Sequence, residues 1–393
     1  MRAVGIIAEF DPFHDGHAYL IKEAKRITGA NHAVVVMSGD FVERGEPAVF
    51  DKFERAYAAV KGGADAVFEI PTAYATSGAK IYSEAGIRLL AATGVVDSIC
   101  FGSECGDIEK LKRLAGLLDN ETAEFKECLQ GFLKSGDSYP KAREKALRES
   151  GADEEDIKMM REPNNILGIH YISAIGSCKC DLAAYTVKRV GAGYHEEKNP
   201  ERAGFDSATG IRNKIFNQKL TNYGECPIHI DDFSQILFSQ LLDLNPEGAV
   251  KYADVTENLA RAVLKHREES LTVSELTAKV KSKNNLYTQI SRALLHIILR
   301  MPESLRGKPG NIRVPYLRLL AFRNESSRLL REVSDNAEAV LVTKPADASC
   351  RNDELFQLDV KAASVYNGAV LAKYGIHRDE DMKRSPVILL DHV

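Results

Sequence analysis

Two histidines, His14 and His17, flank Gly16 in a short turn near the amino terminus. An imidazole ring can donate an N–H group to an oxyanion, and a glycine between two such rings leaves room for a phosphate to approach the backbone. The backbone N–H groups at a helix start also favour an anion, by about 0.3–1 kcal/mol at an exposed site. The spacing therefore predicts a turn that handles the phosphates of a nucleotide.

The residues around this turn predict a strand followed by a helix. Residues 3–8 form an apolar run of strand length, and Leu20, Ile21 and Ala24 recur at helical spacing after the turn. An ordinary helix cap is the alternative for a lone histidine at such a place. Zinc binding through the His-x-x-His spacing is a weaker alternative, because no further ligands complete a site. We favour nucleotide binding and assign no metal site to the protein.

The composition is that of a globular protein. The chain has 393 residues, 44% of them hydrophobic and 27% charged, and its length suggests two or three domains. We find no apolar run that could span a bilayer and no signal peptide, so we expect no membrane association and a cytoplasmic location. The seven cysteines are scattered, which is typical of reduced thiols rather than of a disulfide framework.

The first part of the chain predicts an α/β fold with a Rossmann-like parallel sheet. Apolar runs of strand length recur at residues 33–37, 66–70, 98–101 and 183–187, with helical patterns between them. A charged, wholly helical pattern at about 107–150 predicts an insertion. Ligands of such sheets bind beyond the carboxyl ends of the strands, and the histidine turn lies at such an end. We therefore expect a catalytic domain over residues 1–225.

The rest of the chain, residues 226–393, predicts a mainly α-helical second domain. Helical periodicity covers residues 232–244, 257–266, 272–281 and 286–299, and residues 339–343 form one strand-like run. Between Lys279 and Arg323 there are ten basic residues and a single acid. Such an excess suits a polyanion surface, although a solvated helical face is the alternative. We assign RNA binding to Lys279, Lys281, Lys283, Arg292, Arg300, Arg313 and Arg318.

A second constellation, residues 207–212, places hydroxyl groups and an arginine at a predicted helix start. Arg212 could bind phosphate oxygens through its planar donors, and Ser207 and Thr209 could donate to the same oxygens. A plain cap followed by a surface helix is the alternative. The loop at residues 37–47 follows the second strand and is of the kind that lines an active-site mouth. Two more segments, 101–104 and 163–168, could approach or read an adenine, or could simply form a turn and a cap.

These motifs resemble a known group of proteins. The turn is similar to the HxGH signature of the nucleotidyltransferase superfamily, and Ser207–Arg212 resembles its second, ISSTxIR-type motif. The segments MSGDFVERGEP (37–47), FGSE (101–104), PNNILG (163–168) and SATGIR (207–212) stand in the order typical of the tRNA(Met) cytidine acetate ligase family. Residues 291–296 and 314–322 resemble the helical RNA-binding part of that family, with less specific motifs.

The resemblance implies an enzyme. A member of this family uses ATP to activate acetate as acetyl-adenylate and acetylates the wobble cytidine of elongator tRNA(Met), which gives N4-acetylcytidine. His14 and His17, with Mg²⁺ accompanying ATP, would stabilise the departing pyrophosphate. The ATP-binding residues are expected to be Ile7, Ala8, Glu9, Phe10, Asp11, Pro12, Phe13, His14, Asp15, Gly16, His17, Leu20, Gly102, Asn164, Asn165, Lys188, Arg189, Ser207, Thr209 and Arg212.

One departure from the family pattern keeps other functions open. The family commonly has asparagine where Asp11 and Asp15 stand, and Asp-Pro-Phe-His resembles adenylyltransferases that make cofactors. The first alternative is therefore transfer of AMP from ATP to a small phosphorylated acceptor, against which the large basic second domain argues. The second alternative is an ATP-sensing RNA-binding protein without turnover, which would release no pyrophosphate.

Overall fold

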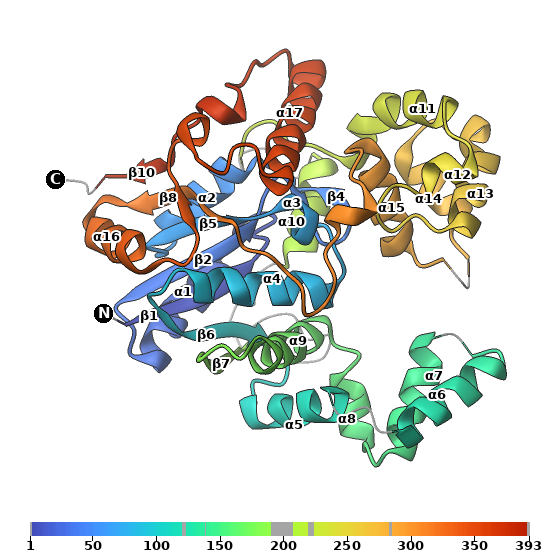
Figure 1. Ribbon diagram of the computed structural model, residues 1–393, viewed down its shortest axis with the longest axis horizontal. Coiled ribbons are helices and arrows are strands. Elements are labelled where there is room, and N and C mark those ends of the chain that lie inside the picture. The colour runs from blue at the N-terminus through green and yellow to red at the C-terminus, as the bar shows by residue number, and fades with distance from the viewer. Residues whose placement is uncertain are drawn as a thin grey trace.

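A mostly parallel sheet with helices on both faces forms the centre of the molecule (Figure 1). The computed structural model describes residues 2–119, 123–137, 139–189, 207–218, 224–282 and 285–390. The strand order is β10-β8-β5-β2-β1-β6-β7, and β9 pairs with β8. The strands are β1 (Ala3–Ala8), β2 (His32–Ser38), β5 (Ala66–Ile70), β6 (Val96–Ser103), β7 (Ala183–Lys188), β8 (Tyr316–Arg323), β9 (Val340–Val342) and β10 (Val387–Leu389). A small hairpin, β3 (Phe41–Val42) and β4 (Glu46–Pro47), follows β2.

The predicted parallel sheet is confirmed. Strand β1 lies between β2 and β6 and runs parallel to both, with Ala8 opposite Met37 of β2. The apolar runs expected to be strands are β2, β5, β6, β7 and β9. Because β1 and β2 end at the same edge, the histidine turn after β1 and the loop after β2 emerge side by side.

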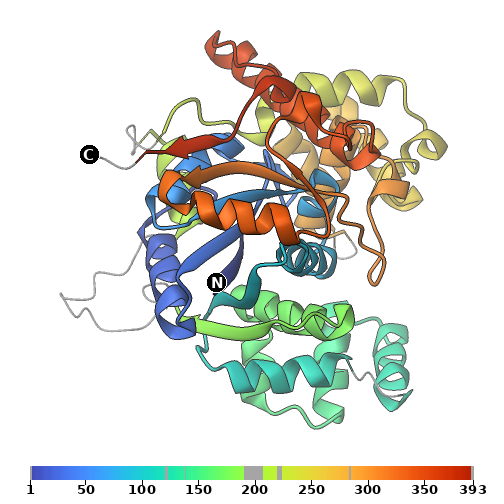
Figure 2. The same cartoon turned by 60° about the vertical axis from the view of Figure 1, so that its left-hand side comes forward.

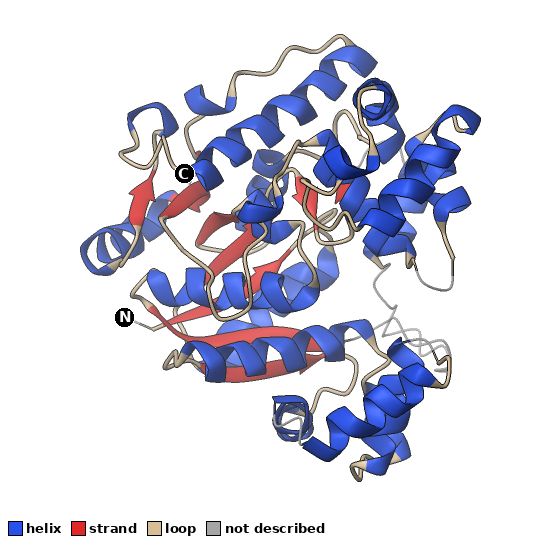
Figure 3. Ribbon diagram, turned by 45° about the vertical axis from the view of Figure 1, so that its right-hand side comes forward, coloured by secondary structure: helices blue, strands red, loops and turns tan. Residues whose placement is uncertain are grey.

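Strand β2 shows why such runs become central strands. Its residues are buried on both faces: Val34 and Val36 enter the core under α4 and α9, whereas Val35 and Met37 enter the core under α1 and α2. A strand of a parallel sheet covered by helices on both faces reads as a continuous apolar run for this reason. The helices that cover the sheet are visible in Figure 3.

The helices of the catalytic part begin and end at residues with clear capping roles. Helix α1 ends at Gly29, which is left-handed (φ 67°), and the side chain of Asp51 caps α2 by accepting from Glu54 N at 2.8 Å. These helices are α1 (Asp15–Thr28), α2 (Lys52–Lys61), α3 (Thr72–Ala75), α4 (Ala79–Ala92), α5 (Ile108–Asp119), α6 (Ala123–Lys134), α7 (Tyr139–Glu149), α8 (Glu154–Met159), α9 (Pro163–Cys178) and α10 (Ala208–Phe216).

The stretch 107–150 contains α5, α6 and α7, which project from the sheet beside α9 (Figure 1). Helices α6 and α7 pack on each other around a small core of their own, to which Phe125, Leu129, Ala142 and Leu147 contribute. Helix α5, in contrast, contributes Leu111, Leu114 and Ala115 to the main core.

A second helical group lies beside the carboxyl edge of the sheet (Figures 1 and 2). It consists of η1 (Ile230–Phe233), α11 (Ser234–Leu242), α12 (Pro246–Ala249), α13 (Glu257–His266), η2 (Arg267–Glu269), α14 (Val273–Val280), α15 (Tyr287–Ile298) and η3 (Glu303–Leu305). The four helices predicted between residues 232 and 299 are present as α11, α13, α14 and α15.

The part of the chain after residue 225 contributes strands to the central sheet as well as helices. Beyond η3 the chain returns to the sheet, where β8 pairs antiparallel with β5 and parallel with β9 and β10. The helix α17 (Glu354–Tyr374) then packs on α3, and α16 (Ser327–Asn336), η4 (Asn324–Ser326), η5 (Pro345–Asp347) and η6 (Asp381–Lys383) complete this part. The segment 314–322, expected to be helical, is largely the strand β8. Residues 226–393 therefore do not fold as one separate helical unit.

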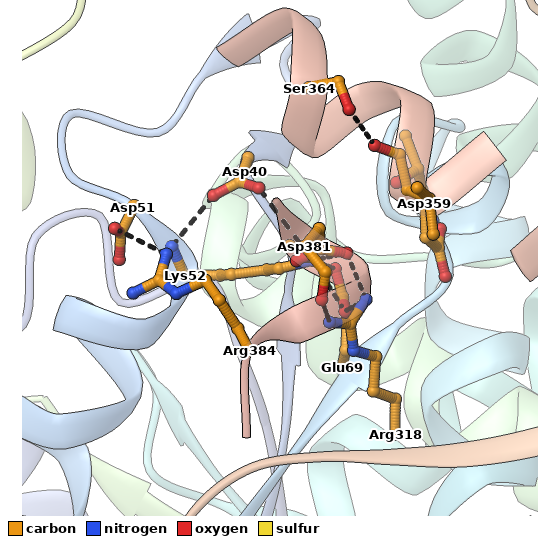
Figure 4. A network of polar contacts seen from close by, with 12 residues as sticks. Asp40, Asp51, Lys52, Glu69, Arg318, Asp359, Ser364, Asp381 and Arg384 are labelled. Atoms are coloured by element: carbon orange, nitrogen blue, oxygen red, sulfur yellow. Dashed lines mark hydrogen bonds and ion pairs between the residues drawn. The ribbon is translucent and has the colours of Figure 1, made fainter. Parts of the chain in front are cut away.

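Arg318, expected to contact RNA, points into the protein from β8 (Figure 4). Its side chain is 1% exposed and pairs with Asp381 and with Glu69 Oε2 at 3.5 Å. Lys52 Nζ lies 2.8 Å from Glu69 Oε1 and 3.1 Å from Asp381 Oδ1. We call Lys52, Glu69, Arg318 and Asp381 the sealed cluster. Because its charges are used within the protein, Arg318 has no access to RNA.

Candidate active site at the first strand end

The histidine turn caps helix α1. The Nδ1 atom of His14 accepts a hydrogen bond from Gly16 N at 3.1 Å, and Nδ1 of His17 accepts one from His14 N at 3.3 Å. The two rings stack, with 3.7 Å between their centroids. A ring nitrogen that accepts carries no hydrogen, so the ring hydrogen of each histidine is on Nε2. The backbone thus fixes both imidazoles as Nε2–H donors.

Histidine 17 is held in its neutral form. Burial lowers the pKa of His17 well below its usual value, and electrostatic interactions with His14 and Arg189 lower it further. Phe10 and Phe13 supply part of this surrounding, with ring centroids 4.8 and 5.6 Å from that of His17. Phe10 is buried and left-handed at φ 48°, a conformation uncommon outside glycine. The backbone bend at Phe10 brings its ring against His17.

Arg212, from the second motif, reaches the first turn. Its Nη1 donates to the backbone oxygen of Asp11 at 2.6 Å, and its Nη2 donates to Thr209 Oγ1 at 3.0 Å. Ser207 caps α10 by accepting from Gly210 N at 3.1 Å. The two motifs, about 200 residues apart in the sequence, therefore meet at the carboxyl end of β1.

Four charged residues form what we call the open cluster: Glu9, Asp11, Arg44 and Arg212. Arg44 Nη1 lies 3.3 Å from Glu9 Oε2, and Arg44 Nη2 lies 2.8 Å from Asp11 Oδ2. Arg212 Nη1 lies 3.5 Å from the same oxygen of Asp11. The carboxylates raise the pKa of Arg44 although burial opposes them. Both guanidinium groups keep partly exposed surface, unlike the sealed cluster.

Asp11 is thus accommodated by its two arginines. Its side chain is 2% exposed, and its Oδ1 accepts from Val49 N at 2.7 Å. Asp15, the other departure from the family pattern, is exposed in the first turn of α1, where the helix dipole favours an acid.

Arg189 and Asn164 form a second side of the site. Arg189 is one of the charges that lower the pKa of His17, and its Nη1 donates to Asn164 Oδ1 at 3.3 Å. Asn164 also donates from Nδ2 to Glu104 Oε1 at 2.5 Å. A Cβ atom on Gly102 would lie 3.4 Å from Arg189 Cγ, so the segments 101–104, 163–168 and 188–189 meet here as well.

Asn165 is not placed to bind ATP, contrary to expectation. It is fully buried, and its Oδ1 accepts from the backbone N–H groups of Glu104 and Cys105 at 3.0 and 3.2 Å. Its Nδ2 donates to Met159 O and to Glu162 Oε2. All four hydrogen-bonding positions of the amide are therefore used within the protein, two by the loop after β6 and two by the turn between α8 and α9, because a buried amide must find partners there.

The other expected ATP residues lie around this centre. Ile7 and Ala8 end β1, and Pro12 is buried in the turn. Leu20 packs on the core beneath α1, so its role there is to hold the helix. Lys188 ends β7, is exposed, and packs its stem against Gly106.

The loop after β2 joins the site to the helical group. Glu43 N donates to Glu9 Oε1 at 2.9 Å, and Arg292 of α15 lies 3.3 Å from Glu43 Oε1 and 3.8 Å from Asp254 Oδ2. Gly45 is left-handed (φ 77°), and a Cβ atom there would lie 2.3 Å from Arg292 N. Arg292 therefore serves this joint, and its expected role as an RNA contact stays a prediction.

The other expected RNA contacts differ in exposure. Lys281 and Arg300 are exposed; Arg313 is exposed but pairs with Asp353 at 3.1 Å; Lys279 pairs with Glu275 at 3.0 Å. Lys283 lies outside the described residues.

Arg55, which the sequence analysis did not single out, supports the strand ends. It is 1% exposed and donates to the backbone oxygens of Glu9, Ser38, Gly39 and Phe50. A single guanidinium thus ties together the ends of β1 and β2. Its position on α2 gave only a buried-face signal, which does not distinguish an arginine that packs its stem from one that bonds to the backbone.

Within the described residues, no group of three His, Cys, Asp or Glu side chains could hold a metal ion. In the same part of the chain, no helix is both long and apolar enough to cross a membrane.

Comparisons with known proteins agree with this geometry. A family model described as HIGH Nucleotidyl Transferase matches residues 1–381. The tRNA(Met) cytidine acetate ligase of Clostridium perfringens is 34% identical over 391 residues, covering 93% of this chain and 95% of the relative. That of Caldicellulosiruptor saccharolyticus is 34% identical over 408 residues, covering 99% of each.

A solved structure is similar over the whole chain. Thermotoga maritima TmcAL bound with alpha-thio ATP is 28% identical, with a TM-score of 0.87 and 100% of both chains covered. The apo form of the same protein gives a TM-score of 0.88. Sequence, fold and the meeting of the two motifs at one strand end thus place the chain in the HIGH nucleotidyl transferase family, among the tRNA(Met) cytidine acetate ligases.

Proposed function

We propose that this chain activates acetate with ATP as acetyl-adenylate and transfers the acetyl group to the wobble cytidine of elongator tRNA(Met). The product is N4-acetylcytidine. The observation that carries the proposal is the contact of Arg212 with the backbone of Asp11, which joins the two nucleotide motifs beside His14 and His17. The relatives support the proposal, since proteins named tRNA(Met) cytidine acetate ligase match this chain over 95% and 99% of their own length.

In the first step an acetate oxygen attacks the α-phosphorus of ATP and pyrophosphate departs. His14 and His17 donate through Nε2–H to oxygens of the departing pyrophosphate, where negative charge accumulates. Arg212 binds the same groups through the face not used by Asp11 and Thr209. Because His17 is neutral, its Nε2–H donates a hydrogen bond to the pyrophosphate without a positive charge that would slow pyrophosphate release.

Magnesium would enter with ATP. The nearest carboxylates of the turn, Glu9 and Asp11, are already occupied by Arg44 and by backbone N–H groups. Mg²⁺ in such sites is coordinated largely by phosphate oxygens and water. It would neutralise phosphate charge, and the protein would hold the complex through Arg212 and the two histidines.

In the second step the exocyclic amine of the cytidine attacks the acetyl carbonyl carbon, and AMP leaves. The base must be unpaired and turned outward, as is typical of RNA recognition in loops. Lys281 and Arg300, two exposed cations of the predicted RNA surface, would bind phosphates of the anticodon arm.

Incubation of the protein with Mg·ATP, labelled acetate and tRNA(Met) tests the reaction. We expect label in the RNA as N4-acetylcytidine, and a far lower rate of labelling when His17→Ala replaces the wild type. Transfer of AMP to a small phosphorylated acceptor would contradict the proposal, as would ATP binding without pyrophosphate release.

The RNA surface is tested by replacing Lys281 and Arg300 with glutamine. We expect tRNA affinity to fall and the log–log salt slope to decrease by about two, roughly one per lost phosphate contact. The matched control replaces Lys112 and Lys126 of the helical insertion, which changes the charge equally. If both pairs of substitutions lowered tRNA affinity equally, net charge alone would attract the tRNA, and the assignment of the RNA surface to Lys281 and Arg300 would be contradicted.

A further inference from the structure

We propose that Arg44 is a positioning residue for Arg212: by occupying the carboxylate of Asp11 it leaves Arg212 available to the triphosphate. This inference rests on the proposed function and adds a residue from the loop after β2 to the nucleotide site.

The geometry gives Asp11 two competing partners. Its Oδ2 atom lies 2.8 Å from Arg44 Nη2 and 3.5 Å from Arg212 Nη1. The shorter pair belongs to Arg44, and the main hydrogen bond of Arg212 is to the backbone oxygen of Asp11 at 2.6 Å. Arg212 is thus anchored by a neutral acceptor, whereas Arg44 takes the charge.

Arg44 also neutralises the neighbouring acids. Its Nη1 lies 3.3 Å from Glu9 Oε2, and its Nε lies 3.6 Å from Glu46 Oε2. Three carboxylates therefore share this one guanidinium. Without it, their charges would oppose a triphosphate and attract Arg212, the other arginine of the open cluster.

An arginine suits this task because its planar fork can meet several carboxylates at once, whereas a lysine ammonium is a single point charge. Its place is fixed by the hairpin β3–β4 and by Gly45, which packs on the backbone of α15. The position of Arg44 is therefore set by the fold before ATP binds.

Removal of Arg44 should turn Arg212 toward the buried carboxylate of Asp11. We expect Arg44→Gln to weaken binding of a nonhydrolysable ATP analogue with Mg²⁺ about tenfold or more, measured by calorimetry, since charge-assisted hydrogen bonds of this kind are at stake. Asp11→Asn added to Arg44→Gln should recover most of the loss, because an asparagine keeps an acceptor for Val49 N without the charge.

A double-mutant cycle with Arg212→Gln decides whether Arg44 acts through Arg212. In the Arg212→Gln background, Arg44→Gln should change the affinity less than twofold. If its tenfold effect persists there, Arg44 binds the ligand directly or supports the fold, and the inference is wrong. If Arg212→Gln alone leaves the affinity unchanged, the role of Arg212 in the proposed function fails, and this inference with it.

Arg113→Gln is the matched control. Arg113 Nη1 donates to Asp156 Oδ2 at 2.9 Å, and the Asp156 side chain is buried like that of Asp11. This variant also leaves a buried aspartate without its arginine, but in the helical insertion. We expect the ATP-analogue affinity to stay within twofold of the wild type; a loss equal to that of Arg44→Gln would show a general effect of destabilisation.

Discussion

Two clusters of acidic and basic side chains have different roles in this protein. They are the sealed cluster (Lys52, Glu69, Arg318 and Asp381) and the open cluster (Glu9, Asp11, Arg44 and Arg212). The side chains of the sealed cluster are at most 2% exposed, whereas those of Arg44 and Arg212 are 30% and 12% exposed. In the sealed cluster two cations meet two carboxylates, and all charges are used inside the protein. In the open cluster Asp11 lies beside both arginines and Arg44 also meets Glu9, but the two guanidinium groups keep exposed surface at which an anion can bind.

The difference follows from position in the sheet. The sealed cluster lies where β5 and β8 pair, beneath the carboxyl-terminal segment that carries Asp381 (Figure 4). The open cluster lies beyond the ends of β1 and β2, where Asp11 is buried but Arg44 and Arg212 keep exposed surface. Burial makes a matched set of charges necessary, because an unpaired buried charge costs several kcal/mol. A site for a ligand requires the opposite, namely donors whose partners are incomplete.

The largest expected effect comes from breaking the sealed cluster. Arg318→Leu leaves Asp381 and Glu69 without one of their two cations and should lower the free energy of unfolding by about 3–5 kcal/mol. Urea denaturation measures this loss, and the ATP-analogue affinity of the folded protein should not change. The control is Arg323→Leu on the same strand, whose side chain is 27% exposed and pairs with Glu325. It should cost about 1 kcal/mol or less; equal losses would contradict the comparison.

The next effect concerns the histidine turn, beside the open cluster. His17→Ala should reduce acetate-dependent pyrophosphate exchange about 10²–10³-fold, the usual loss for a donor to developing negative charge. The unfolding free energy should change far less than with Arg318→Leu. His32→Ala at the opposite end of β2 is the control and should leave the exchange rate within twofold. Unchanged exchange in His17→Ala would refute the role of this ring.

The smallest expected effect concerns Asp40, which lies in the loop after β2, next to the sealed cluster. Asp40 follows β2 and accepts from Lys52 N at 2.9 Å. Burial raises the pKa of Asp40 to about 6, against the attraction of Lys52 and with the help of Asp51, Glu69 and Asp381. A raised pKa means that its protonation stabilises the fold below pH 3.8 and that this contribution is lost as the pH rises through about 6.

Asp40→Asn should therefore become more stable relative to the wild type as the pH rises from 4 to 7. The gain should reach about 1–3 kcal/mol, given about 1.4 kcal/mol per pKa unit and the lost attraction to Lys52. Urea midpoints at pH 4, 5.5 and 7 measure the difference. A difference that is constant over this range would show that Asp40 does not titrate there.

The strands and the helical segments were predictable because each follows a simple period. The apolar runs at 33–37 and 66–70 fit strands buried on both faces, and residues 257–266 carry the helical spacing of one buried face. Strand β8 was expected to be helical because residues 314–322 resemble the helical RNA-binding part of the family. The apolar run Tyr316–Ala321, interrupted only by Arg318, does not by itself distinguish a strand from a helix. Its partner β5 is about 250 residues away, so no local signal could decide the matter.

Within the site, the type of side chain was informative and its direction was not. The histidine turn and Arg212 were recognisable because few other residue patterns suit phosphate. In the sequence Arg292, Arg300 and Arg318 are equivalent positive charges. In the structure Arg292 pairs with Glu43 of the loop after β2, Arg318 is buried in the sheet, and Arg300 is exposed. Asn165 differs from Asn164 by one position on α9, which turns its amide into the protein.

The amino-acid sequence alone determined the family, the parallel sheet and the phosphate turn, because these depend on local periods and on short motifs whose residues are neighbours in the chain. Only the tertiary structure decided which charges remain available to ligands. That outcome depends on which distant carboxylate reaches each arginine, and contacts between residues hundreds of positions apart leave no trace in composition or spacing.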